Sequence, residues 1–418
     1  MCPVSHERSA QPVGSFDEES WQEYPSARVE ACLSRTRPIV AGRGEKPGVC
    51  RIGSFGRRRC VRYDDPMRVE LVERPGEEWD QFAEAHPDGR LGHAAAWAPI
   101  LEAAYGLKPH YLAARAGNGD LVGLLPLVAL RSRPGGKQSL ISLPFLDSAG
   151  ILASNPEVEA ALLAHATSLT AEGGSTGLEL RQAGAWTGSG AVDAGSEASM
   201  DRVNLVLPLK SSDESQWTAL SAKVRNQCRK AEREGLTLAA GDASALLHGF
   251  LLPYRINMRD LGSPPHSAAF FDALARHFGD RVRFVVTQHA RLSVGGLVAI
   301  RFGRRVYVPW ASTLRSERNR CPNNQIYWEA IRWAIETGAT EFDFGRSPQD
   351  AGTYRFKKGW GAVEEVLAWH WIDAAGHRTS RAAGTDNPIV RRLSRIWTRL
   401  PVSVATALGS RLRRYFSN

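Results

Sequence analysis

The segment from Phe342 to Gly361, FDFGRSPQDAGTYRFKKGWG, constrains the fold and chemistry of this chain more than any other segment. Its first residues alternate apolar and polar side chains, the period-2 pattern of a strand with one buried face. The pattern ends at Gly345, and the proline and glycines that follow favour tight turns. Four basic residues lie in this irregular stretch: Arg346, Arg355, Lys357 and Lys358. The segment predicts a strand followed by a flexible cationic loop, which suits an anionic or carbonyl-bearing substrate.

Two runs in this segment, FDFGRS and GTYRFKKGWG, resemble the C-terminal signature of FemAB-like transferases. Three further runs fit the same family: KVRNQCRKAEREG from Lys223, VPWASTL from Val308 and NNQIYWEAI from Asn323. The resemblance covers residues 67–400 and is strongest to the FemAB-related proteins associated with exosortase/PEP-CTERM exopolysaccharide systems. It implies a tandem GNAT fold and the formation of an amide bond.

Length and composition fit a globular protein with two units. The chain has 418 residues, of which 43% are hydrophobic and 23% charged, enough for a full core. No apolar run reaches the ~18 residues of a membrane span. The longest candidate, Leu121 to Leu130, contains Pro126, and the first thirty residues show no secretory signal pattern. We therefore expect a cytoplasmic protein.

Residues 1–66 differ in character from the rest. They contain four of the six cysteines but no sustained hydrophobic period, so we expect little fixed structure there. Patterned sequence begins at Met67, and an over-extended reading frame would explain the preceding extension. The cysteine spacings match no zinc-ligand pattern, and no metal site is expected. Cys228 and Cys321 are expected to be reduced thiols.

The positive charge is concentrated outside the central part of the chain. Of the net charge of +9, residues 1–66 contribute +2 and residues 386–418, with seven arginines and one aspartate, contribute +6. The nearly neutral remainder gives little support to a broad nucleic-acid-binding surface. Residues 386–418 have the spacing of a basic amphipathic helix. This helix would either dock on the core or contact an anionic inner-membrane surface.

The order of predicted elements indicates an α/β protein with a mixed sheet and one GNAT-like fold used twice. The first subdomain is assigned to residues 67–200 and the second, of the BioF2-like acetyltransferase type, to residues 201–375. Helices are expected at 79–86, 94–105, 156–171, 217–233, 243–258, 267–278 and 324–337. Strands are expected at 110–115, 121–130, 177–180, 203–208, 283–288, 293–301, 304–310, 341–344 and 366–371, with a loop at 188–199.

The acyl donor stays open between an acyl-CoA and an aminoacyl-tRNA. A GNAT fold ordinarily binds the pyrophosphate of CoA at a Gln/Arg-x-x-Gly-x-Gly/Ala turn that opens a helix. The two nearest runs, Arg181 to Trp186 and Gln349 to Tyr354, both end in a bulky ring that would block close backbone approach. The FemAB resemblance implies an aminoacyl-tRNA donor instead. No cofactor is firmly implied.

The resemblance places Phe356 and Lys357 at the Phe-Lys pair of the Fem motif. It implies that Lys357 binds the donor and stabilises charge on the acyl carbonyl, as a cation near a developing oxyanion would. Tyr354 and Lys358 are candidate substrate contacts in the same stretch. The structural alternative is that both lysines only solvate a turn.

Asp343 and Arg346 are the next candidates. A carboxylate at a strand end beside a basic loop could take up the proton of an attacking amine. The two residues could equally form an ion pair that fixes the loop, and Arg346 could clamp a phosphate.

Two further groups of residues are candidates for substrate binding, and each also has a structural alternative. Lys223, Arg225 and Arg229 share a helix that could track phosphates or simply be solvated. Trp310 ends a predicted strand and is a pocket candidate.

The sequence thus predicts a transferase that joins an activated acyl or aminoacyl group to an amine on a cell-envelope or exopolysaccharide precursor. The alternatives are a CoA- or carrier-dependent N-acyltransferase and a noncatalytic assembly factor of polysaccharide export. A tRNA and, through residues 386–418, the inner membrane are the expected partners.

Overall fold

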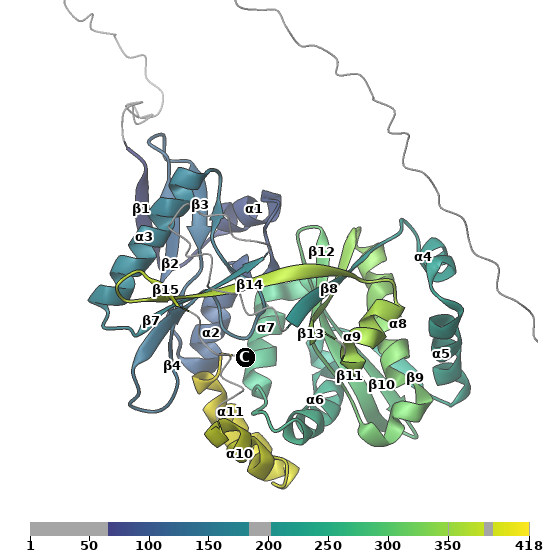
Figure 1. The fold of residues 1–418 in the computed structure, drawn as a ribbon. Coiled ribbons are helices and arrows are strands. Elements are labelled where there is room, and N and C mark those ends of the chain that lie inside the picture. The colour runs from purple at the N-terminus through teal and green to yellow at the C-terminus, as the bar shows by residue number, and fades with distance from the viewer. Residues whose placement is uncertain (1–65, 184–201, 350, 380–387, 418) are drawn as a thin grey trace, which may run out of the picture. The chain divides into compact units, whose positions relative to one another are not determined.

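The computed structural model describes residues 66–183, 202–349, 351–379 and 388–417 (Figure 1). The α-helices in these ranges are α1 Glu77–Ala85, α2 Trp97–Tyr105, α3 Pro156–Glu172, α4 Asp213–Ala219, α5 Ala222–Arg233, α6 Ala243–Asp260, α7 Ala268–Phe278, α8 Pro322–Glu336, α9 Gly352–Gly359, α10 Pro388–Trp397 and α11 Val402–Leu412. The strands are β1 Arg68–Val72, β2 Tyr111–Arg115, β3 Leu121–Leu125, β4 Val128–Arg131, β5 Gln138–Ile141, β6 Leu152–Ala153, β7 Gly177–Ala183, β8 Arg202–Pro208, β9 Thr237–Gly241, β10 Val282–His289, β11 Leu292–Phe302, β12 Arg305–Thr313, β13 Glu341–Pro348, β14 Val363–Asp373 and β15 Arg378–Thr379.

Two sheets are present in the described ranges. The smaller has the order β1-β2-β3-β6. The larger is mixed and has the order β4-β5-β7-β14-β8-β13-β12-β11-β10-β9, with β15 on β14. The predicted α/β class with a mixed sheet is confirmed.

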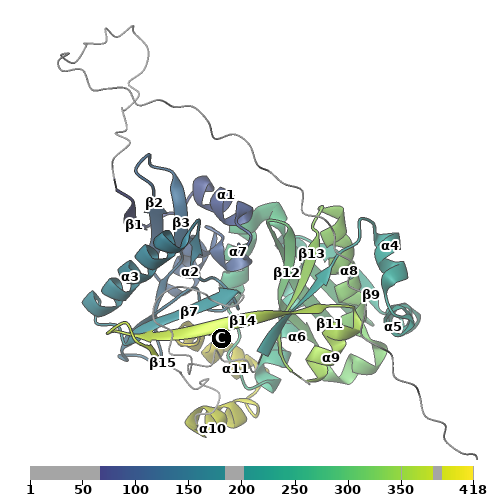
Figure 2. The same cartoon turned by 45° about the horizontal axis from the view of Figure 1, so that its top comes forward.

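Strand β14 joins the two halves of the chain into one sheet. Its C-terminal part pairs antiparallel with β7 and its N-terminal part with β8, and Figure 2 shows it as one long ribbon that spans both halves. The core is shared as well, because Trp97 of α2 packs on Phe278 of α7 with ring centroids 5.3 Å apart. The division at residue 200 therefore separates two segments of sequence that share a sheet and a core.

Most predicted elements of the second half are confirmed. The expected three-strand meander corresponds to β10, β11 and β12, which pair antiparallel in sequence order. Serine side chains cap three of the helices: the hydroxyl of Ser212 accepts the N–H of Ser215, that of Ser221 the N–H of Val224, and that of Ser267 the N–H of Phe270. The expected helix after Cys321 is α8.

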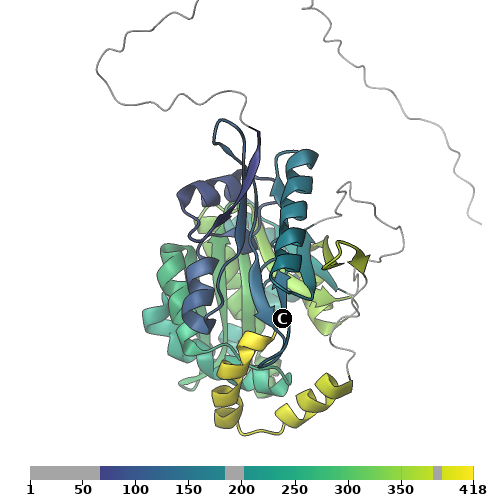
Figure 3. The same ribbon diagram turned by 90° about the vertical axis from the view of Figure 1, so that its left-hand side faces the viewer.

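Three predicted elements are each divided in two. The expected strand Leu121 to Leu130 breaks at Pro126 into β3 and β4, which lie in different sheets, because proline cannot donate to a ladder. The expected helix from Trp217 becomes α4 and α5, since Ser221 starts a new helix. The basic C-terminal segment forms α10 and α11, separated at Pro401 (Figure 3).

The expected flexible loop after Phe344 is wrong. Strand β13 continues through Gly345 to Pro348, and the residues after Ala351 form helix α9. Glycines mark the two ends of this helix, so the same residues that favour turns here delimit a short helix. Lys357 is therefore a helical residue and not a loop residue.

Two predictions concern residues outside the described ranges, namely the structure of residues 1–65 and the loop at 188–199. Within the described residues, no helix combines the length and the hydropathy needed to cross a bilayer.

Candidate functional site

The candidate site lies where two parallel strands part. Strands β12 and β13 pair over only three positions, from Arg305 opposite Glu341 to Tyr307 opposite Asp343. Beyond these positions β12 stays paired with β11, and β13 stays paired with β8. The two strands thus diverge after Asp343 and leave main-chain groups of β13 without a β12 partner.

Gly345 shapes β13 at the point of divergence. The pairing of β13 with β8 shifts register between Asp343 and Arg346, as in a β-bulge. Gly345 adopts φ +74°, in the left-handed region where a side chain would be strained. Its N–H donates to the Asp343 carboxylate over 2.7 Å. The bulge turns two carbonyls, those of Gly345 and Arg346, toward α9.

Lys357 binds these two carbonyls. Its ammonium, on α9, donates to Gly345 O at 2.7 Å and to Arg346 O at 2.9 Å. The side chain is buried, with 7% exposed. Burial disfavours the charged form and lowers the pKa of Lys357 to about 8, against the opposing attraction of Asp343 and Asp147. An ammonium group has three donors, and the two carbonyls occupy two of them.

Asp343 belongs to a buried network of charges. One carboxylate oxygen accepts from Asn204 Nδ2 at 2.8 Å and from Arg305 Nη1 at 3.3 Å. Arg305 also donates to Glu365, which in turn accepts from Arg90. Burial raises the pKa of Asp343, although Arg305 and Asn204 favour its ionised form. The network fixes the strand ends on which the site is built.

Glu365 is the strongest acid of this network. Burial opposes its ionisation, but the hydrogen bond from Arg305 and the charges of Arg90 and Arg305 outweigh it, and the pKa of Glu365 falls to about 2. Burial opposes the charge of Arg305, but the interactions with Tyr307, Asp343 and Glu365 outweigh it and raise the pKa of Arg305.

Arg346 pairs with Asp147 and not with Asp343, so the ion pair that the sequence offered as one alternative is not formed. Its Nε lies 3.0 Å from Asp147 Oδ1, and its backbone N–H donates to Oδ2 at 3.3 Å. Its guanidinium lies over the ring of Trp369, 4.8 Å from the centroid. The indole N–H of Trp369 donates to the carbonyl of Asp147 at 2.9 Å. A loop of the first half and β14 thus meet at β13.

The remaining predicted residues of α9 lie on its other sides. Phe356 is half-buried and packs on Tyr327, with ring centroids 5.4 Å apart. The hydroxyl of Tyr354 donates to Glu364, and the Lys358 ammonium lies 3.8 Å from the same carboxylate. These three side chains do not join the contacts of Lys357.

Trp310 packs in the core. Strand β12 continues past it to Thr313, and its ring contacts Phe270, Phe271 and His266 with centroids 5.3 to 5.5 Å apart. The expected end of the strand at Trp310 is therefore wrong, whereas its role as a substrate contact stays a prediction; 8% of the residue is exposed.

The helix predicted to carry Lys223, Arg225 and Arg229 is α5, and these three side chains make different contacts. Arg225 donates to the carbonyls of Thr218 and Leu220 and so completes the end of α4. Arg229 lies over the ring of Trp217, at 5.6 Å, and Lys223 is exposed. The start of α5 lies near α9, because the Ser221 hydroxyl donates to the carbonyl of Gly359 at 3.5 Å.

Several residues of the site were not found from the sequence. They are Asn204, Arg305, Glu365, Arg90, Asp147, Trp369 and Arg181. A signal existed for Asn204 and Arg181, since a polar residue within an apolar strand requires a partner. Asp147 lies in a loop that gave no such signal.

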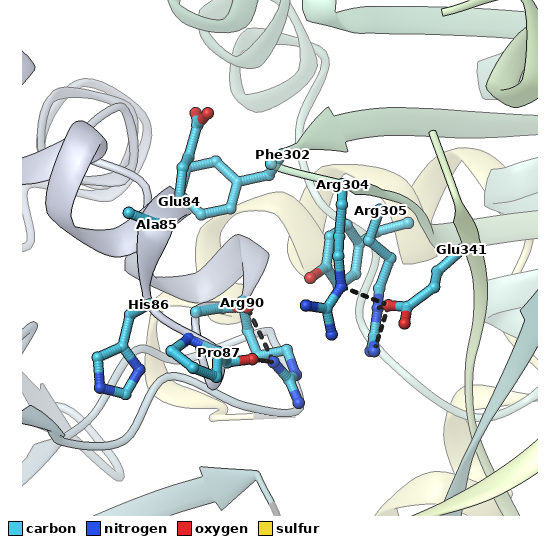
Figure 4. Close-up of a pocket in the computed structure, with 12 residues that line it drawn as sticks. Glu84, Ala85, His86, Pro87, Arg90, Phe302, Arg304, Arg305 and Glu341 are labelled. Carbon is cyan, nitrogen blue, oxygen red and sulfur yellow. Dashed lines mark hydrogen bonds and ion pairs between the residues drawn. The ribbon is translucent and has the colours of Figure 1, made fainter. Parts of the chain in front are cut away.

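A pocket lies at the opposite end of the β12–β13 pair and shares Arg90 and Arg305 with the charged network (Figure 4). The space between its lining residues has a volume of about 350 Å³, part of which is open solvent. Arg90, Arg304, Arg305 and Glu341 are among its lining residues, and Arg304 and Arg305 both contact the Glu341 carboxylate. None of the residues predicted for the site lines this pocket. We therefore centre the candidate site on Lys357.

In the part of the chain that the structure describes, no group of three or more histidine, cysteine or acidic side chains is arranged to hold a metal ion.

Comparison with known proteins supports the class of enzyme. Residues 220–358 match the acetyltransferase (GNAT) domain family. The solved structure of FemX has a TM-score of 0.56 at 16% identity and covers 71% of this chain and 96% of its own. A tandem GNAT protein from the clavulanic acid biosynthesis pathway has a TM-score of 0.47 at 14% identity, covering 74% of this chain and 98% of its own. No curated protein matches the sequence.

The chain carries a GNAT acyltransferase domain on a fold like that of FemX. The matched residues include β12, all of β13 and Lys357 itself. The protein is therefore an acyltransferase, and its reaction requires an acyl donor and an acceptor. The exosortase and PEP-CTERM association stays a prediction from sequence.

Proposed function

We propose that the protein forms an amide bond between an activated acyl or aminoacyl group and an amine on a cell-envelope or exopolysaccharide precursor. The observation that carries this proposal is the buried Lys357 ammonium at the divergence of β12 and β13, with two donors held by carbonyls and a third left for a ligand. The nitrogen of the acceptor attacks the acyl carbonyl carbon. The C–N bond forms as the C–O bond of an ester donor, or the C–S bond of a thioester, breaks.

Lys357 acts on the acyl carbonyl oxygen. The third N–H donates to that oxygen as negative charge develops on it, an interaction that is strong in a site sheltered from water. The two carbonyl contacts fix the direction of the ammonium before the substrate arrives. Preorganised donors of this kind lower the barrier because they need not reorient during the reaction.

Asp343 supports this arrangement and is the candidate acceptor of the amine proton. Its raised pKa increases its basicity relative to an exposed aspartate. One of its oxygens holds the N–H of Gly345, which keeps the bulge in place. The ion pair considered from the sequence, between Asp343 and Arg346, is absent among the described contacts, and Asp343 pairs with Arg305 instead. Asp343 would thus both accept the amine proton and hold the bulge in its conformation.

Two classes of acyl donor fit this proposal, an aminoacyl-tRNA and an acyl-CoA. An aminoacyl-tRNA would place its phosphates along the exposed cations of α5, of which Lys223 lies close to the Ser221 contact with α9. An acyl-CoA would require no such track. Charge reversal at Lys223 should therefore impair transfer from a charged tRNA while sparing transfer from an acyl-CoA.

We further propose that the C-terminal helices contact an anionic membrane surface, where a lipid-linked acceptor would lie. Ser394 and Trp397 of α10 pack against Gly262 and Gly409, while Leu393 and Ile396 are 59% and 50% exposed. A helix fully docked on the core would bury such side chains. Exposed arginines flank them, namely Arg392, Arg395 and Arg399, and the sequence has no acidic residue between 388 and 417. Aliphatic side chains mixed with cations suit the interface of an anionic bilayer.

The test is transfer of a labelled acyl group to an extract of envelope precursors. Mixed charged tRNAs and mixed acyl-CoAs are supplied in separate reactions, each with the wild type and with folded Lys357→Met. Transfer by the wild type and its loss in the variant support the proposal. No transfer from any donor would favour the noncatalytic assembly factor.

A further inference from the structure

The end of the chain reaches the candidate site. Helix α11 buries Ala405 and Gly409 on one face, and Arg413 continues this face at the next turn, with 5% exposed. The segment Arg413–Ser417 then lies against the first half of the chain, where Figure 3 shows the chain end beside the blue strands. Two of its residues, Arg413 and Ser417, contact the loop that contains Asp147.

This loop, residues 142–148, has a strained backbone. Leu143 and Phe145 adopt φ +71° and +74°, in the left-handed region that side chains rarely occupy. Such conformations persist only where surrounding contacts determine them. The N–H of Phe145 donates to the carbonyl of Ser417 at 2.8 Å, and the Arg413 guanidinium lies over the Phe145 ring, 4.9 Å from its centroid. The chain end thus holds the loop at its strained residue.

A continuous series of contacts leads from Ser417 to Lys357. The carbonyl of Ser417 also accepts from Arg181 Nη2 at 3.2 Å. Arg181 donates to the carbonyl of Leu146 at 2.6 Å and lies over Trp369, 4.2 Å from the centroid. Trp369 holds the carbonyl of Asp147, whose carboxylate holds Arg346. The carbonyl of Arg346 accepts from Lys357, which completes the series.

We propose that the segment Arg413–Ser417 is a positioning element of the site, which holds the 142–148 loop so that Asp147 fixes Arg346 and, through it, the carbonyl that orients Lys357. The inference rests on the proposed function for its effect on catalysis, but not for the contact itself. It gives the C-terminal segment a role distinct from membrane contact, because Arg413 is buried whereas Arg411 and Arg414 are exposed.

The first measurement is hydrogen exchange in the full-length protein. Arg413→Gln removes the guanidinium, and Arg414→Gln is the matched control, since it removes the same charge from an exposed neighbour. Exchange should rise about 10-fold or more in a peptide covering 142–148 for Arg413→Gln only, because the Phe145 ring loses its contact with the guanidinium and the segment that carries the Ser417 carbonyl is held less firmly. Deletion of residues 416–418 removes the Ser417 carbonyl without altering Arg413, and serves if Arg413→Gln does not fold.

The second measurement is a double-variant cycle on acyl transfer. Arg413→Gln and Asp147→Asn should each lower kcat/KM about 10-fold or more, mainly through kcat, because both misplace a reacting group. The double variant should lose little more than the worse single variant, and Arg413→Lys should recover part of the rate.

Unchanged protection of residues 142–148 in folded Arg413→Gln would overturn the proposal. Additive losses in the double variant, or loss of protection with normal transfer, would also overturn the positioning role. If the wild type transfers no acyl group, the proposed function fails, while the exchange measurement still decides whether the chain end holds the loop.

Discussion

Replacing Lys357 by methionine separates its role in stability from its role in catalysis. Burial lowers the pKa of Lys357 from 10.5 to about 8, which corresponds to roughly 3 kcal/mol of destabilisation of the folded state at pH 7. Methionine has a similar length and relieves this cost. It also leaves the carbonyls of Gly345 and Arg346 without a donor, at about 1–3 kcal/mol. The two terms oppose each other, so Lys357→Met should fold with a free energy of unfolding within about 2 kcal/mol of the wild type.

The pH dependence of stability checks the first term. Between pH 8 and 10.5 the unfolded chain retains a proton that folded Lys357 has released, so the stability of the wild type should rise with pH relative to Lys357→Met. The difference between their free energies of unfolding should increase by about 2 kcal/mol from pH 8 to pH 10, measured by urea unfolding. A constant difference over this range would show that the pKa of Lys357 is not lowered.

The catalytic term should be much larger than the change in stability. If the ammonium stabilises the acyl oxyanion, Lys357→Met should lower kcat/KM on the order of 10²-fold or more. The wild-type rate should fall as pH rises through about 8, because the deprotonated amine carries no positive charge. Lys358→Met is the matched control and should cost less, since Lys358 is exposed and lies beside Glu364. Near wild-type transfer by folded Lys357→Met would refute the assigned role.

Three further outcomes are expected. Arg305→Met removes the ion pair of buried Asp343 and one of the two ion pairs of half-buried Glu365, which keeps Arg90, and it should lower the free energy of unfolding on the order of 3–5 kcal/mol. Arg304→Met at the exposed neighbour should change it by less than about 0.5 kcal/mol in chemical denaturation. Deletion of the residues before Met67 should leave the thermal midpoint unchanged, and a large fall would show that they pack on the rest of the chain. In vesicle sedimentation, binding should require anionic lipid, weaken as salt rises and disappear without residues 386–418; equal, negligible binding to neutral and anionic vesicles would contradict membrane contact.

The sequence predicted helices and strands well wherever the hydrophobic residues followed a single helical or strand period. The meander of β10, β11 and β12 and the helix α8 have hydrophobic patterns that match their buried faces, so each could be recognised without its neighbours. The segment around Lys357, which is rich in glycine and basic residues, was harder to predict. Glycines and cations around Lys357 indicated a loop, but Lys357 lies on α9 because its aliphatic stem and ammonium face the carbonyls of β13.

The acyltransferase domain could be inferred from the order of residues alone, and Lys357 could be selected as a candidate, since the Fem-like runs are contiguous in sequence. The partners of those residues could not. Arg346 could pair with Asp343 or with any other carboxylate, and only the folded chain brings Asp147, 199 positions away, to its guanidinium. The same holds for Arg181 and Ser417, which are 236 positions apart. Local patterns determine which faces are buried, whereas the meeting of two strained or charged segments depends on the packing of the whole sheet, which no short run of sequence encodes.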